Sequence, residues 1–123
     1  NGIIDFFDGR KIQDYPDKVD DHHIYPDDYL RSTLSITNNK KINCILNRAL
    51  IHKSTNRSKY IGNISPREYL TEIKKNLGEA KFKILCETHV LASDLASPVY
   101  GNFKKFLKYR EEKISLLIDK AVS

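Results

Sequence analysis

The sequence predicts an α+β domain, and three observations support that class. Two short segments containing apolar residues, 19–25 and 48–51, have the length and composition of strands. From residue 65 onward, apolar residues recur every three or four positions, which is the spacing of amphipathic helices. A chain of 123 residues can form one domain with a modest core. Short strands followed by a run of helices are typical of the α+β class.

The composition indicates a soluble globular protein. Hydrophobic residues make up 40% of the chain and charged residues 30%, which is too apolar for a disordered protein. The apolar runs are too short to cross a membrane and no signal peptide is visible, so we expect a cytoplasmic protein without a membrane partner. Because the chain starts at Asn1 and contains no methionine, we also expect a fragment of a longer protein.

The first half of the chain predicts short elements. Residues 1–18 mix apolar residues with Gly, Pro and Asp, which indicates a lead-in segment. A strand over 19–25 should stop at Pro26, because proline cannot donate to a sheet. One helical turn should follow the proline, and then a polar loop over 35–41. The second strand, 48–51, should lead into another helical turn.

The second half predicts three helices. Ser65, Pro66 and Glu68 form a strong start signal, with a serine N-cap, a proline in the first position and a glutamate that closes a capping box. This helix should end near Gly78, and a second should cover 79–91.

The last predicted helix covers residues 102–121, with an apolar face that fits the 3.6-residue period, and Phe103 and Phe106 are expected to be core residues. The apolar positions on that face are Phe103, Phe106, Leu107, Ile114, Leu117, Ile118 and Ala121. Basic residues of this helix either form a solvated outer face or contact DNA; they are Lys104, Lys105, Lys108 and Arg110. His89, on the apolar face of the preceding helix, is expected to be a buried core histidine.

Charge is distributed unevenly along the chain. Residues 1–30 contain eight acidic and three basic residues (3 − 8 = −5), whereas residues 31–123 contain 18 basic and eight acidic residues (18 − 8 = +10). An acidic segment can hold a divalent cation, and a basic remainder suits a polyanion such as nucleic acid. The alternative is an unevenly charged surface without a ligand. Cys44 and Cys86 stand far apart in apolar surroundings, which indicates reduced, buried thiols and makes a closed zinc site of an interaction protein the weakest alternative.

The stretch VDDHHIYPDDYL carries the first candidate chemistry. It places His22 and His23 side by side in a chain with four histidines. One histidine can bind a metal through a neutral ring nitrogen, while the other takes a proton from water, since its ordinary pKa is ~6.5. The alternative is a surface pair without a function.

The stretch NRALIHKSTN carries the second half. Asn47 and Asn56 stand nine residues apart, and a hairpin followed by a short helix can bring Asn56 back beside His22. An asparagine carbonyl oxygen is a suitable ligand for Mg²⁺ or Mn²⁺. Asn47 can instead hydrogen-bond the segment that carries the histidines and fix its geometry.

Together, DDHHIYP and NCILNRALIHKSTNR resemble the signature of HNH, or His-Me finger, nucleases. The longer pattern, with SPREYL and FKKFLKYRE, resembles the C-terminal HNH half of GmrSD-type restriction proteins, in which an N-terminal ParB-like domain uses nucleotide. This resemblance implies a ββα-metal motif over 19–60, with a helical extension over 61–123 packed on it as one domain. It also implies a metal-dependent deoxyribonuclease of a restriction or antiviral defence protein, with DNA and the N-terminal domain as partners.

The resemblance also implies roles for individual residues. His23 matches the general base, and Asn47 matches the middle asparagine of the catalytic motif. His22 and Asn56 match the metal ligands, and Asp21 is a further candidate ligand. His22 stands where RNA-guided nucleases have aspartate and is similar to the colicin DNases in this respect, which leaves the metal open between Mg²⁺ or Mn²⁺ and Ni²⁺ or Zn²⁺.

Residues around Asn56 are candidates for binding the neighbouring phosphates, with a solvated surface as the alternative: His52, Lys53, Arg57 and Lys59. The alternative for the whole chain is a catalytically inactive nucleic-acid-binding module of HNH-like fold. Such a module would bind DNA without metal and without cleavage.

Overall fold

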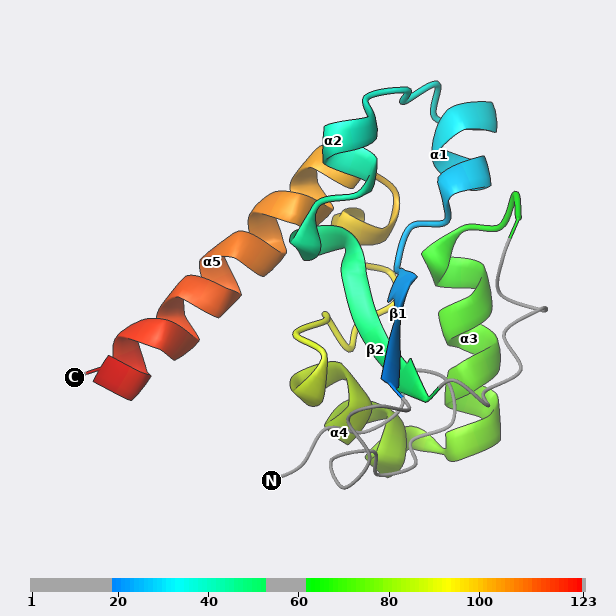
Figure 1. Ribbon diagram of the computed structural model, residues 1–123. Coiled ribbons are helices and arrows are strands. Elements are labelled where there is room, and N and C mark those ends of the chain that lie inside the picture. The colour runs from blue at the N-terminus through cyan, green and yellow to red at the C-terminus, as the bar shows by residue number, and fades with distance from the viewer. Residues whose placement is uncertain (1–18, 53–61, 123) are drawn as a thin grey trace.

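The computed structural model describes residues 19–52 and 62–122 of the chain. A two-stranded antiparallel sheet lies at the centre, formed by β1 (Val19–His23) and β2 (Arg48–His52), and helices surround it (Figure 1). The predicted α+β class is confirmed, with both strands close to their expected positions. The helical turn expected after the second strand falls outside the described residues, as does the lead-in at 1–18.

The register of the sheet decides which side chains face the core. His22 lies opposite Ala49, and both are buried. His23 lies opposite Arg48 on the other face of the hairpin, because successive side chains of a strand point in opposite directions. The two adjacent histidines are therefore directed to different faces at the same end of β1.

The connection between the strands contains more helix than the sequence predicts. The expected turn after Pro26 is α1 (Asp27–Ser32). The polar loop expected over 35–41 is wrong in part, because α2 (Asn39–Ile42) begins there. The Asn38 side chain accepts a hydrogen bond from the backbone N–H of Lys41 and caps this helix. A short 3₁₀ helix, η2 (Ile45–Asn47), then leads directly into β2.

The predicted capping box is present at the start of α3 (Pro66–Leu77). The Ser65 hydroxyl accepts from the N–H of Glu68, and the Glu68 carboxylate accepts from the N–H of Ser65, each at 3.2 Å. The helix ends at Gly78, whose φ of +86° suits glycine.

Replacing Ser65 with alanine should remove this cap and lower the free energy of unfolding by ~1 kcal/mol, because it leaves the N–H of Glu68 without its side-chain partner. Urea unfolding monitored by circular dichroism would measure the change. Ser115→Ala, on an exposed stretch of the last helix, is the matched control and should not destabilise the protein.

Three more elements complete the fold: α4 (Glu79–Thr88), η4 (Pro98–Tyr100) and α5 (Phe103–Val122). The second predicted helix ends three residues earlier than expected, because Val90 adopts a positive φ of 59° and turns the chain. His89 is buried, as the sequence predicts. Across the part of the chain that the structure describes, no helix combines the length and apolar character needed to cross a membrane.

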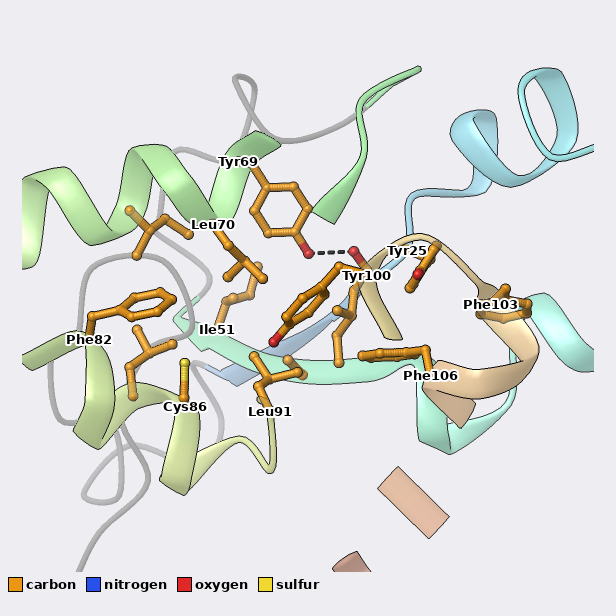
Figure 2. Close-up of a cluster of buried hydrophobic side chains, with 14 of the residues drawn as sticks. Tyr25, Ile51, Tyr69, Leu70, Phe82, Cys86, Leu91, Tyr100, Phe103 and Phe106 are labelled. Carbon is orange, nitrogen blue, oxygen red and sulfur yellow. Dashed lines mark hydrogen bonds between the residues drawn. The ribbon is translucent and has the colours of Figure 1, made fainter. Parts of the chain in front are cut away.

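An aromatic core joins these elements (Figure 2). The Tyr25 ring lies 5.1 Å from Phe103 and 5.0 Å from Phe106, centroid to centroid, so the chain that follows β1 packs on the start of α5. Cys86 is buried in the same cluster, and burial raises the pKa of its thiol to about 12. Cys44 is half-buried, and both cysteines are free.

The apolar face of α5 is buried near the start of the helix, where the prediction of Phe103 and Phe106 as core residues is confirmed. Phe103 and Phe106 are buried, but Leu117 and Ile118 are 54% and 56% exposed. The C-terminal half of α5 extends past the other labelled elements in Figure 1. The helical period alone does not reveal where the neighbouring elements end.

Candidate active site

A cavity of about 350 Å³ lies at the end of β1 and brings together both candidate histidines. Its lining consists of Asp21, His22, His23, Pro26, Asp27, Asp28 and Gly62. The lining thus includes two histidines and three aspartates. Apart from Gly62, all of these lining residues belong to the stretch DDHHIYPDD.

The two histidines reach the cavity from different environments. His22 is only 6% exposed, and its ring meets the Tyr69 ring of α3 edge-on, with the centroids 6.4 Å apart. His23 is half-buried on the outer face of the hairpin. A buried imidazole is suited to a fixed ligand, whereas a partly exposed one can exchange a proton with water.

The backbone that follows the histidines is held by hydrogen bonds at four consecutive polar groups. The N–H of Ile24 donates to the Asn47 carbonyl at 2.9 Å, and the Ile24 carbonyl accepts from the Tyr69 hydroxyl (Figure 2, dashed line). The N–H of Tyr25 donates to Asn47 Oδ1 at 2.8 Å, and Asn47 Nδ2 donates to the Tyr25 carbonyl at 3.1 Å. This Ile24–Tyr25 clamp fixes the end of β1 and therefore the direction of the histidines.

Asn47 is fully buried and acts on backbone groups. Its second amide hydrogen donates to the Ile42 carbonyl at 3.0 Å, so both amide hydrogens are used. The side chain does not line the cavity. Of the two roles that the sequence leaves open for Asn47, this geometry supports the one in which its side chain hydrogen-bonds the segment that carries the histidines.

Replacing Asn47 with leucine, which has a similar size, should lower the free energy of unfolding by ~2–4 kcal/mol. The change leaves the N–H of Tyr25 and the carbonyls of Tyr25 and Ile42 without their amide partner inside the protein. Urea unfolding would measure the loss. Asn76→Leu, on the exposed surface of α3, is the control and should change stability by less than ~0.5 kcal/mol.

A second set of hydrogen bonds lies on the outer face of the hairpin, around His23. His23 Nε2 lies 2.9 Å from Asn43 Oδ1. Arg48 links the same region, because its Nε donates to the Asn43 carbonyl at 3.1 Å and its Nη1 donates to the Asp21 carboxylate at 2.8 Å. Sequence reasoning missed Asn43 and Arg48. The only available signal was the position of Arg48 directly after Asn47.

The predicted phosphate-binding residues are largely outside the described part of the chain. Lys53, Arg57 and Lys59 lie there, together with the candidate ligand Asn56. His52 ends β2 and pairs with Val19, so its backbone lies four strand positions, or ~13 Å, from the level of His23.

Two of the candidate metal ligands, His22 and Asp21, lie in the described part of the chain. His22 and Asp21 line the same cavity, but the Asp21 carboxylate also pairs with Arg48. Within residues 19–52 and 62–122, no three His, Cys, Asp or Glu side chains are arranged to hold an ion. The buried imidazole of His22, in a cavity with carboxylates, has suitable chemistry for a divalent metal.

The Arg110 side chain is buried, whereas its sequence pattern predicts an exposed cation. It is only 6% exposed, and its guanidinium donates to four backbone carbonyls. Those acceptors are Leu46 at 2.7 Å, Arg48 at 3.1 Å, His89 at 2.8 Å and Val90 at 3.3 Å. The expectation that Arg110 belongs to a solvated outer face or a DNA contact is therefore wrong. It joins β2 to the end of α4.

Comparisons with known proteins add one relative. No protein-family model matches the chain, and no solved structure matches it. The chain is similar to the uncharacterized protein MJ0686 of Methanocaldococcus jannaschii, with 30% identity over 135 residues. The similarity covers 93% of this chain and 22% of the archaeal protein, so the chain spans about a fifth of that relative's length.

Proposed function

We propose that this chain is a metal-dependent endonuclease domain of the HNH, or His-Me finger, type that hydrolyses phosphodiester bonds of DNA. The observation that carries the proposal is the shared cavity of His22 and His23, at the end of a strand held by Asn47. The order of these residues in the sequence resembles that of the HNH signature. A ββα-metal core over residues 19–60 is part of the proposal.

His23 is the general base in this proposal. It is half-buried at the cavity, where a water molecule can reach its ring. A neutral imidazole can accept a proton from that water as the water attacks the phosphate. Asn47 and Tyr69 hold the strand end, so the ring keeps its direction while the proton moves.

His22, Asn56 and Asp21 would hold the metal, which would supply charge stabilisation at the scissile phosphate and the leaving oxygen. The charges around the cavity support a metal requirement. Asp21, Asp27 and Asp28 all line it, and these carboxylates repel an anionic phosphodiester. Of the three, Asp21 pairs with Arg48 and Asp27 with Arg31. A divalent cation would offset the remaining repulsion and allow DNA to approach.

A role within a restriction or antiviral defence protein belongs to the same proposal. It is supported by the resemblance to the C-terminal half of GmrSD-type proteins. In that setting the chain would act with an N-terminal domain of the same protein.

A cleavage assay on supercoiled plasmid DNA tests the proposal. The chain would be incubated with Mg²⁺, Mn²⁺, Ni²⁺ or Zn²⁺, and in parallel with EDTA. We expect nicked or linear DNA with at least one metal and none with EDTA. If no metal supports cleavage while DNA is bound in a metal-independent, salt-sensitive manner, the inactive binding module is the better description.

A further inference from the structure

We infer that Asn43 is a positioning residue for His23: it holds the proton of the neutral ring on Nε2 and leaves Nδ1 as the atom that accepts a proton from water. The inference deepens the proposed function and rests on it for the catalytic meaning of His23. The hydrogen bond from which it starts joins His23 Nε2 and Asn43 Oδ1 over 2.9 Å.

The chemistry of the two groups sets the direction of this bond. A carboxamide oxygen can only accept a hydrogen bond, so Nε2 must donate. A neutral imidazole carries one N–H, and the other nitrogen then holds the lone pair. With Nε2 protonated, Nδ1 is the only basic atom of the ring. One contact thus selects both the tautomer and the orientation of the ring.

Asn43 is itself held in place by the backbone. It follows α2, and its N–H donates to the Asn39 carbonyl at 2.9 Å. Its carbonyl accepts from Arg48 Nε at 3.1 Å, and Arg48 is bonded to Asp21 in turn. The Asn43 backbone is therefore fixed from α2 on one side and from β2 on the other. An orienting group needs this support, since a mobile acceptor would not fix the ring.

Without the Asn43 acceptor, the His23 imidazole should remain present as a base but lose its fixed orientation. In Asn43→Leu, we expect kcat for plasmid nicking to fall by ~10- to 100-fold with little change in KM, since the effect lies in the orientation of a reacting group. Asn43→Asp keeps an oxygen acceptor at the same position and should recover most of the loss. Asn76→Leu is the matched control and should behave like the wild type.

A measurement that does not depend on cleavage decides the tautomer. The ¹⁵N chemical shifts of both His23 ring nitrogens would be recorded at a pH above which they no longer change, so that the ring is neutral. We expect a fully protonated Nε2 and an unprotonated Nδ1 in the wild type and in Asn43→Asp. In Asn43→Leu, both shifts should move toward the averaged values of a free histidine ring.

The outcomes separate the two proposals. A wild-type ring protonated on Nδ1, or unchanged shifts in Asn43→Leu, would overturn the role of Asn43 whether or not the chain cuts DNA. The expected shifts together with a chain that never cleaves DNA would support the contact between Asn43 and His23 and count against the nuclease. If the shifts change as expected but kcat does not fall, Asn43 orients the ring without consequence for the reaction, and the positioning role is wrong.

Discussion

Replacing His23 with alanine should reduce the rate of metal-dependent DNA nicking by ~10²–10⁴-fold, which is the usual contribution of a general base. The fold should survive, because His23 is half-buried and, among the described residues, its side chain has one hydrogen bond, to Asn43. Losing such a bond at a partly exposed position should cost ~1 kcal/mol or less. Initial nicking rates and the thermal unfolding midpoint, measured on the same preparation, would check both halves of the prediction.

His52→Ala is the matched control for this experiment. It removes the same side chain from the other end of the hairpin, where position 52 pairs with Val19. We expect its rate to stay within ~10-fold of the wild type, because a phosphate contact supplies less than a general base. Equal rates in His23→Ala and wild type would mean that His23 is not the base. An equal loss of nicking rate in both variants would indicate that the reaction does not take place at the cavity at the end of β1.

Replacing Arg110 with methionine should lower the free energy of unfolding by ~3–4 kcal/mol. Methionine keeps most of the apolar stem of the arginine but removes every hydrogen bond to the four carbonyls that the guanidinium contacts. Each bond to a charged donor typically contributes ~1.5–3 kcal/mol, and buried carbonyls left without a donor add a desolvation cost. Non-additivity of such bonds keeps the total below their sum. Urea unfolding at neutral pH would give the value.

Lys108→Met provides the control within the same helix. Lys108 is exposed, so its change to methionine should alter stability by less than ~0.5 kcal/mol. Arg110→Lys should give an intermediate loss, since an ammonium group keeps the charge but cannot reach four acceptors in the geometry of a guanidinium. A change below ~1 kcal/mol in Arg110→Met would contradict the structural role assigned to this side chain.

The parts of the fold that depend on neighbouring residues could be predicted from the sequence. The start of α3 is an example, because Ser65, Pro66 and Glu68 form their contacts within four positions. The strand pair could also be predicted, since β-branched or apolar residues and Pro26 mark its limits. Asn38 was missed because a cap followed by a single turn gives little periodic signal.

The parts that depend on distant residues could not be predicted. Arg110 has the spacing of an outer-face cation, and only the position of the α4 end and of η2 shows that it is buried. Leu117 and Ile118 have the same helical spacing as the buried Phe103 and Phe106, but more than half of each side chain is exposed. For the candidate site, the adjacent histidines could be found from their sequence pattern. The partner of His23 could not, because it depends on where α2 places Asn43.

The Ile24–Tyr25 clamp has a consequence for the order in which the protein acquires its cavity. The groups that hold this dipeptide come from Asn47 and Tyr69, 22 and 45 positions later, and the Tyr25 hydroxyl donates to the carbonyl of Val99, 74 positions later. Contacts of such separation form slowly, and during translation they cannot form until the later residue exists. At ~5–20 residues per second, a ribosome needs ~4–15 s to proceed from Tyr25 to Val99. A nascent chain therefore carries both histidines for seconds before their strand end is fixed, and a peptide cut after residue 60 should lack an ordered cavity altogether.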